Sequence, residues 1–208
     1  MKSFNINDDL KQNYKLLIGS ILPRPIAWIS TINEDGTNNL APFSFFTAVS
    51  AIPMVVGFSP LLRASTGKIK DTHVNILREK EFVVNFVSED LIDHCNLTST
   101  ELKYGDDEFS FAQLTPLDSQ KIKAKRVQES KIHFECILKD ILTYGEDKGS
   151  GSFITGEVLC VHVDDSIVND GRIDTQKFNP IGRGAGNDWI KTDSIITRDR
   201  LTKAQIQK

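Results

Sequence analysis

Three short runs rich in β-branched and aromatic residues constrain the fold of this chain more than any other feature. They cover residues 26–32, 53–59 and 81–87, and a polar turn at residues 33–36 closes the first run. A continuous apolar run of about 4–8 residues indicates a strand that is buried on both sides or that belongs to a closed barrel. We therefore predict a curled sheet as the framework of the fold.

A long antiparallel hairpin is predicted further along the chain. Residues 132–138 alternate between an apolar face and a face that carries His133 and Glu135. A polar, glycine-bearing turn follows at residues 145–152, and residues 153–163 are predicted to form the returning strand. Alternation with a period of two is typical of antiparallel strands that face a core on one side.

Helices are expected only as short inserts. The spacing of apolar residues predicts one over residues 71–80, with Asp71 or Thr72 as its N-cap, and a second over residues 88–102. A last short helix is expected from Thr197 onward. Antiparallel strands therefore dominate, and the predicted fold class is mainly β with α+β character.

Length, charge and cysteine content exclude several classes of protein. The 208 residues suit a single domain spanning 1–208, and a 39% apolar share is enough for a core. With 25 basic and 28 acidic residues the formal net charge is −3, which argues against a nucleic-acid-binding surface. No apolar run approaches the roughly 20 residues of a membrane span. Three scattered cysteines indicate reduced thiols, which suit the cytoplasm. Taken with the charge balance and the lack of a long apolar run, they lead us to expect a cytoplasmic protein that binds neither nucleic acid nor membrane.

The common catalytic and metal-binding motifs are missing from the sequence. No glycine fingerprint follows a strand and opens a helix, and the glycine-rich residues 182–186 lack the Lys-Ser/Thr of a P-loop. The four histidines show no zinc-ligand spacing. His162 near Asp164 and Asp165 could bind a metal, but at the end of a strand a solvated pair is the favoured interpretation. We therefore predict no metal site, and none of these motifs points to a catalytic residue.

An anion-binding site is one of two interpretations of the segment that follows the second apolar run. Arg63 lies in a loop after a strand that ends at Ser59, and Lys70 precedes Asp71 and Thr72 at the start of a predicted helix. Two cations, a hydroxyl group and unpaired helix N–H groups together favour an anion. A solvated loop with a capped helix explains the same residues, so residue types alone leave the choice open.

Several motifs, occurring in one order, resemble the flavin reductase-like, FMN-binding split-barrel family, with the flavoredoxin-type branch as the nearest match. The matching segments are residues 24–31, 39–46, 70–72 with Asn75 and Ile76, 81–85, 133–136 and 180–183. The resemblance implies a six-stranded antiparallel Greek-key split β-barrel with short flanking helices. Its core spans about residues 17–170, and residues 171–208 form a C-terminal extension.

The resemblance also implies a homodimer that binds FMN near the subunit interface. The strand end at Ser30 and Thr31, with residues 39–44, would line the flavin ring and ribityl chain, and the residues around the helix start would surround the phosphate. The candidate cofactor-binding residues are Trp28, Ser30, Thr31, Asn39, Ala41, Pro42, Phe43, Ser44, Ser59, Arg63, Lys70, Asp71, Thr72, His133 and Trp189.

Three of these candidates also have a purely structural interpretation. Trp28 can form part of the barrel wall, His133 can pair with Glu135, and Trp189 can cover the barrel end. The family often carries Arg-Leu-Gly-Gly followed by a tyrosine near the flavin, whereas this chain has Arg-Gly-Ala-Gly at residues 183–186 and then Trp189.

In function, the resemblance implies an oxidoreductase that takes electrons from NADH or NADPH and passes them through bound FMN to a free flavin or another acceptor. A small-molecule donor and acceptor are then its partners. Two alternatives remain open: a non-enzymatic FMN-binding electron carrier, and a split barrel that binds another ligand such as haem. The cluster of Arg63, Lys70 and Thr72 favours FMN, because a phosphate group gives these side chains an obvious use.

Overall fold

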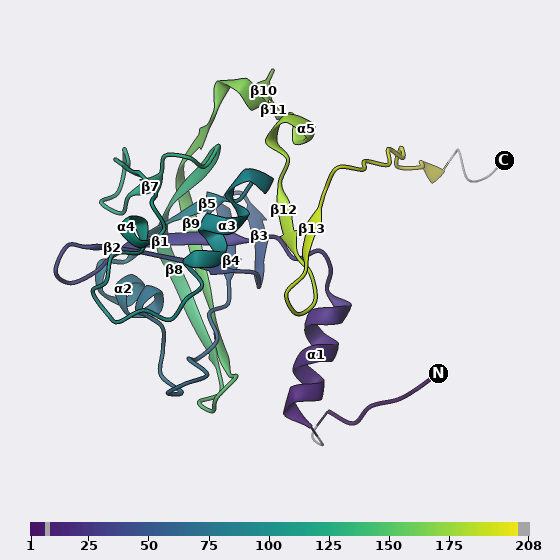
Figure 1. The fold of residues 1–208 in the computed structure, drawn as a ribbon. Helices are drawn as coiled ribbons and strands as arrows, with labels where there is room; N and C mark the ends of the chain where they lie inside the picture. Colours follow the sequence, from purple (N-terminus) through teal and green to yellow (C-terminus); the bar gives the residue numbers. More distant parts are fainter. Residues whose placement is uncertain (7–8, 204–208) are drawn as a thin grey trace.

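One antiparallel sheet of seven strands dominates the computed structural model, which describes residues 1–6 and 9–203 (Figure 1). Its strands are β1 Ala27–Ile32, β2 Asn38–Phe43, β3 Phe46–Ala51, β4 Met54–Phe58, β5 Glu81–Phe86, β8 Ile132–Tyr144 and β9 Gly151–Val163. The spatial order is β2-β1-β5-β8-β9-β4-β3. The two edge strands, β2 and β3, follow one another in the chain with only two residues between them, so the sheet curls back on itself as a split barrel.

The mainly β class is confirmed, and the sheet has one strand more than the six that were predicted. Strand β3, which begins after the chain turns at Ser44 and Phe45, has no counterpart among the predicted apolar runs. Most of β3 is exposed, so it lacks the apolar pattern that predicted β1, β4 and β5. The runs predicted at residues 26–32, 53–59 and 81–87 form β1, β4 and β5.

Strand β1 is buried on both faces, as its continuous apolar run predicts. Ile29 points into the barrel, where it packs in a cluster with Phe58 and Phe82. Trp28 faces the opposite way, into a second cluster with Phe109. The short helices α3 Ile92–Leu97 and α4 Glu108–Phe111 contribute to this outer cluster. The core therefore lies on both sides of β1, and this strand is fixed from two directions.

The predicted long hairpin is confirmed and is longer than expected, with 13 residues in each of β8 and β9. Its register places His133 opposite His162 and Glu135 opposite Cys160. A bulge follows Glu135, where the pairing shifts by one residue. Cross-strand partners share a face of the sheet, so these four side chains lie on one side of the hairpin.

The helices differ from prediction in several places. Helix α2 Asp71–Glu79 occupies the predicted segment, but its N-cap residue is Lys70, and neither Asp71 nor Thr72 caps it. The helix expected over residues 88–102 is only a 3₁₀ turn, η1 Glu89–Leu91, followed by α3, which ends at Leu97. The hydroxyl of the next residue, Thr98, accepts the Trp28 indole N–H and donates to the Cys95 carbonyl. Residues 197–202 are irregular, and residues 204–208 of the last expected helix lie outside the described residues.

Shorter elements complete the chain, and three helices, α1, α4 and α5, were not predicted. Helix α1 Leu10–Ser20 begins at Asp9, whose carboxylate accepts the N–H groups of Lys11 and Gln12. The remaining elements are β6 Pro116–Leu117, β7 Arg126–Val127, η2 Asp165–Ile167, β10 Val168–Asn169, β11 Arg172–Ile173, α5 Thr175–Phe178, β12 Ile181–Arg183 and β13 Trp189–Lys191. No helix among the described residues is long and apolar enough to span a bilayer.

A buried arginine joins α1 to the barrel. The guanidinium of Arg24 donates hydrogen bonds to the carbonyl oxygens of Ile18 at 2.5 Å, Ile21 at 3.2 Å and Gly184 at 2.6 Å. Its Nε atom donates to Ser44 Oγ at 3.3 Å. Main-chain oxygens thus satisfy a charge that is only 4% exposed. The end of α1, the turn after β12 and the turn between β2 and β3 therefore meet at one side chain.

Candidate functional site

A pocket of about 230 Å³ lies beside the start of α2, and we call it the α2 pocket. Its walls come from β2, from the loop before α2 and from the segment between α3 and α4. The lining residues are Asn39, Ala41, Pro42, Arg63, Ala64, Lys70, Asp71, Thr72, Thr98, Ser99, Thr100, Glu101, Leu102 and Glu108.

A second pocket of about 130 Å³ adjoins the first, and we call it the Trp189 pocket. It is lined by Ile26, Pro42, Ser44, Cys95, Asn96, Ser99, Arg183 and Trp189. Pro42 and Ser99 line both pockets, so the two form one extended depression. Together they reach the lower end of the roughly 300–1,000 Å³ that small-molecule sites occupy in proteins.

The start of α2 offers free hydrogen-bond donors to the α2 pocket. Lys70, at the N-cap position, has an extended backbone and makes no side-chain capping hydrogen bond. Among the described residues, the main-chain N–H groups of Asp71 and Thr72 have no acceptor. Free N–H groups and the positive end of the helix dipole favour an anion at this point.

The two cations of the α2 pocket are in different states. Arg63 is already paired, with Asp71 Oδ1 at 2.7 Å and Glu101 Oε1 at 3.1 Å. The ammonium of Lys70 forms no ion pair with any described carboxylate and lies 5.4 Å from the centre of the Phe43 ring. Burial lowers the pKa of Lys70, with the nearby Arg63 charge as a second cause. An anionic ligand would therefore meet one cation that lacks a counter-charge.

Buried hydrogen bonds hold the inner wall of the α2 pocket in place. Asn39 Nδ2 donates to Thr31 Oγ1 at 3.1 Å and to Thr72 Oγ1 at 3.0 Å. Asn75 Nδ2 donates to the same Thr31 oxygen at 3.0 Å and to Asn33 Oδ1 at 2.7 Å. All five residues are buried. The network links β1, β2 and α2, so it fixes the start of α2 against the barrel.

Glu108 places a titratable carboxyl group at the edge of the α2 pocket. Its Oε2 atom accepts the main-chain N–H of Leu40 at 3.2 Å, and the residue is 7% exposed. Burial raises the pKa of Glu108 to about 7, and the negative charges of Asp71 and Asp107 add to this effect. The charge of the pocket therefore changes within the physiological pH range.

Most of the candidate residues line these two pockets. Asn39, Ala41, Pro42, Arg63, Lys70, Asp71 and Thr72 line the α2 pocket, and Ser44 and Trp189 line the Trp189 pocket together with Pro42. In the second pocket, the Arg183 guanidinium lies 5.0 Å from the Trp189 ring centre, which is a cation–π contact.

The remaining candidates lie behind the pocket walls or elsewhere. The Trp28 indole N–H donates to Thr98 Oγ1 at 2.8 Å, and the Ser30 hydroxyl donates to the Lys125 carbonyl at 2.5 Å. Thr31 belongs to the buried network, and Phe43 packs in the barrel interior. Ser59 is half-buried beside the turn between β2 and β3.

His133 lies apart from both pockets, on the hairpin face that the loop at residues 118–126 covers. Its Nε2 atom is 2.8 Å from the Val127 carbonyl oxygen, and its Nδ1 atom is buried without a partner among the described residues. Burial lowers the pKa of His133 to about 4, so the ring is neutral at physiological pH. The alternative pairing with Glu135 is not seen, because Glu135 bonds instead to His162.

Residues 98–102 and Glu108 line the α2 pocket and were not among the candidates. The run Thr98, Ser99, Thr100 carries three adjacent hydroxyl groups, which is a usable signal for a polar site. This run did not lead to a predicted site, because residues 88–102 were assigned to one helix. In a helix these three side chains would point in different directions around the axis.

A curled antiparallel sheet, with a two-part pocket beside the start of α2, has the architecture of a split barrel. The sequence supports the same assignment. The pattern of the flavin reductase like domain matches residues 18–176, and the chain belongs to this family. The predicted family is therefore confirmed.

Three relatives illustrate the similarity. The uncharacterized protein BH2278 of Halalkalibacterium halodurans is 36% identical over 197 residues, which cover 94% of each chain. The crystal structure of nitrilotriacetate monooxygenase component B from Bacillus cereus is 35% identical, with a TM-score of 0.89, and the match covers 97% of this chain and 98% of that one. Flavoredoxin of Desulfovibrio vulgaris is 19% identical with a TM-score of 0.73, covers 86% and 91% of the two chains, and shows the shared fold alone.

Substituting Glu108→Gln is expected to change how stability depends on pH. The raised pKa means that the folded state holds a proton that the unfolded state loses near pH 4.5, so wild-type stability falls as pH rises from there to about 7. The variant has no carboxyl group to titrate, so its free energy of unfolding should not fall in this way. Its advantage over wild type should grow between about pH 4.5 and pH 8 and reach roughly 1–3 kcal/mol. Urea unfolding at a series of pH values measures this free energy.

The exposed Glu34→Gln substitution is the matched control, and its stability should follow that of wild type over the whole range. A constant difference between Glu108→Gln and wild type at every pH would contradict the raised pKa.

Proposed function

We propose that this protein is an FMN-dependent oxidoreductase that takes electrons from NADH or NADPH and delivers them to a free flavin or another small acceptor. The observation that carries the proposal is the unpaired Lys70 ammonium beside the free N–H groups at the start of α2. Membership of the flavin reductase like family supports a flavin as the ligand.

The residues of the α2 pocket fit the phosphate of FMN. Lys70 supplies a charge without a partner, and the main-chain N–H groups of Asp71 and Thr72 supply directed donors. The Asp71 carboxylate would repel a phosphate, but its contact with Arg63 at 2.7 Å offsets part of that repulsion. A phosphate group therefore supplies the acceptors that the free N–H groups and the Lys70 ammonium lack.

The flavin ring is then expected to extend from the α2 pocket toward the Trp189 pocket. Pro42 and Ser99 join the two, and the Trp189 ring forms part of the far wall. Bound flavin supplies two-electron transfer between a nicotinamide donor and an acceptor. The chain itself contributes binding and orientation, through a wall that the Thr31 and Asn39 hydrogen bonds keep rigid.

Similarity to component B of a monooxygenase supports an enzyme over a simple carrier. A non-enzymatic FMN-binding carrier remains the alternative, because the same pocket would serve both. The two differ in one property, which is whether the bound flavin reacts with a nicotinamide faster than free flavin does.

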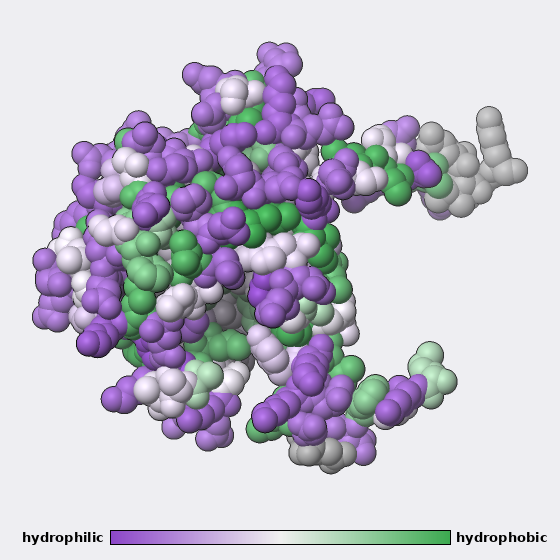
Figure 2. All heavy atoms as spheres, viewed as in Figure 1, coloured by the Kyte–Doolittle hydropathy of each residue, from purple (hydrophilic) through white to green (hydrophobic). Residues whose placement is uncertain are grey.

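We further propose that the protein forms a homodimer through the face that carries α1. Leu10, Tyr14, Leu17 and Ile21 follow helical spacing and are all substantially exposed, which leaves an apolar stripe on this helix. Figure 2 shows the helix and the C-terminal arm projecting from the same side of the barrel, with apolar atoms along the surface between them. A second copy would cover this surface.

Substituting Lys70→Ala should weaken FMN binding by about 1.5–3 kcal/mol, because a charged hydrogen-bond partner of the phosphate is lost. Riboflavin, which lacks the phosphate, should bind both forms equally well. Fluorescence titration of the flavin-free protein with each ligand measures the two affinities. Lys68→Ala, which removes a nearby exposed lysine of the same loop, is the control. An equal loss for FMN and riboflavin would rule out a phosphate contact.

Anaerobic mixing of the FMN-loaded protein with NADH or NADPH should bleach the flavin absorbance faster than the same mixture with free FMN. Stopped-flow absorbance measures both rates. Bleaching no faster than free FMN would favour the carrier, and a protein that takes up no flavin at all would contradict both functions.

The dimer is expected to dissociate on Leu17→Lys substitution, because a charge would be buried in the apolar stripe. Sedimentation equilibrium gives the mass of the wild type and the variant. The control is Leu159→Lys, at an exposed position on β9 away from α1. A wild-type mass of one chain would contradict the proposed assembly.

A further inference from the structure

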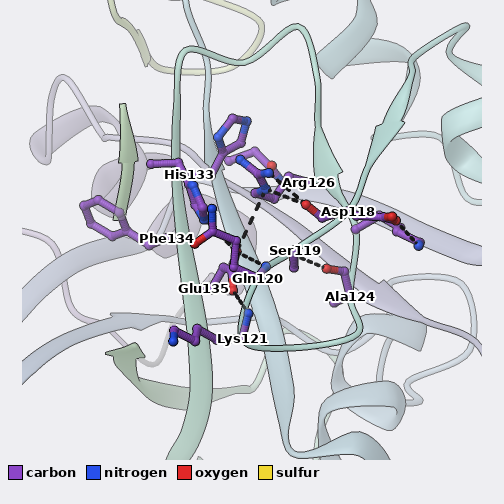
Figure 3. Close-up of polar contacts among 12 residues, drawn as sticks. Asp118, Ser119, Gln120, Lys121, Ala124, Arg126, His133, Phe134 and Glu135 are labelled. Atoms are coloured by element: carbon purple, nitrogen blue, oxygen red, sulfur yellow. Dashed lines mark hydrogen bonds and ion pairs between the residues drawn. The ribbon is translucent and has the colours of Figure 1, made fainter. Parts of the chain in front are cut away.

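The hairpin β8–β9 carries a second cluster of reactive side chains, which belongs to neither pocket. The register pairs His133 with His162 and Glu135 with Cys160, so all four lie on one face of the hairpin. Figure 3 shows the Glu135 side chain directed at Gln120 and Lys121 in the loop that runs from Asp118 to Arg126, so this loop lies over this face.

Three of the four side chains bring potential metal ligands together. The carboxylate of Glu135, the thiol of Cys160 and the imidazole of His162 have donor atoms that all lie within 4.8 Å of one another. Glu135 is fully buried, whereas Cys160 and His162 are partly exposed. An ion can therefore approach from the side of Cys160 and His162 and meet the carboxylate at the inner end of the cluster.

The surroundings of Glu135 resemble the outer shell of a metal site. Its two carboxylate oxygens accept the main-chain N–H groups of Gln120 at 2.8 Å and Lys121 at 2.7 Å, which fixes their orientation (Figure 3). His162 Nε2 lies 2.6 Å from Glu135 Oε1. Ligands in metal sites are commonly held in this way by hydrogen bonds from the surrounding chain.

A hydrogen-bonded Glu135–His162 pair is the simplest alternative, and it leaves two groups unexplained. The Cys160 thiol is free and makes no hydrogen bond among the described residues. The Nδ1 atom of His133, on the same face, is buried and has no partner in the described part of the chain. The Cys160 sulfur is therefore an electron-pair donor beside the pair, whereas His133 is not among the side chains whose donor atoms lie within 4.8 Å of one another.

One cation, Arg126, lies close to the three candidate ligands. Arg126 lies 3.9 Å from Glu135 Oε1, but its guanidinium is engaged with the Asp118 carbonyl at 2.8 Å. A carboxylate and a thiolate together carry two negative charges, which balance a divalent cation and leave only the arginine charge in excess.

We propose that Glu135, Cys160 and His162 bind a divalent metal ion of the zinc class. Sulfur, imidazole nitrogen and carboxylate oxygen in one set are typical ligands of Zn²⁺ and unsuited to Mg²⁺ or Ca²⁺. Binding of the ion releases the proton of the Cys160 thiol to solvent, while the His162 ring keeps its one N–H proton on Nδ1 so that Nε2 can bind the ion. Because the covering loop is bonded to Glu135, a bound ion fastens this loop to the hairpin.

Spacing along the chain does not reveal this cluster. Cys160 and His162 are two residues apart, but Glu135 lies on the neighbouring strand and meets them only through the hairpin register. The expectation that the chain holds no metal site rested on linear spacing, which is informative when ligands come from turns or single helices.

The test uses the tag-free full chain, stripped with a chelator, dialysed and then titrated with Co²⁺ and with Zn²⁺. Cobalt bound through a thiolate gives an intense charge-transfer band in the near ultraviolet. A tetrahedral site also gives d–d bands, and these lie at longer wavelengths than flavin absorption. Wild type should show these bands at one equivalent of Co²⁺ and lose them when Zn²⁺ is added. Zn²⁺ should also raise its thermal unfolding midpoint.

The variants separate a metal site from a hydrogen-bonded pair. Cys160→Ser should lose the charge-transfer band, and His162→Gln should weaken binding at least about tenfold, although its amide can still donate to Glu135. Glu157→Gln, on the same strand and paired with Lys139, is the control and should bind as wild type does. Circular dichroism confirms that each variant is folded. A wild type without the cobalt bands, or with bands unchanged in Cys160→Ser, would overturn the proposal.

Discussion

The geometry of the pocket depends on one buried hydroxyl group, that of Thr31 in β1. It accepts hydrogen bonds from Asn39 of β2 and Asn75 of α2, and Asn39 reaches on to Thr72 at the start of α2. A buried donor left unpaired costs about 1–3 kcal/mol, so these groups keep one arrangement rather than several. Thr31 is itself buried, on a strand that is packed on both faces. The free N–H groups at the start of α2 are thus held at a constant place relative to the barrel.

The two cations at the start of α2, Arg63 and Lys70, have different roles. Arg63 holds Asp71 and Glu101 and thereby joins α2 to the segment after α3. Lys70, without a carboxylate and lying near the Phe43 ring, keeps its charge available to a ligand. A planar guanidinium suits the first task because it can bond to two carboxylates at once, and a compact ammonium suits the second. The formal net charge of −3 therefore says little about the local field.

The parts that could be predicted from sequence are those with a strong local pattern. The strands β1, β4 and β5 and the β8–β9 hairpin have continuous or alternating apolar residues, and Lys70 to Thr72 stand at a recognisable helix start. Strand β3 has no such pattern, because it lies exposed at an edge, and the hydroxyl run from Thr98 was obscured by an expected helix. The pairing of Glu135 with Cys160 and His162 depends on a register that includes a bulge, which periodicity cannot specify.

The bonds of Arg24 give the molecule a mechanical joint between its outer helix and its pocket. The same guanidinium holds the last turn of α1 through Ile18 and Ile21 and the pocket wall through Ser44 and the Gly184 carbonyl. Displacing either segment would leave this buried guanidinium with fewer hydrogen-bond acceptors, which costs free energy. The single side chain therefore sets the position of α1 relative to the Trp189 side of the depression.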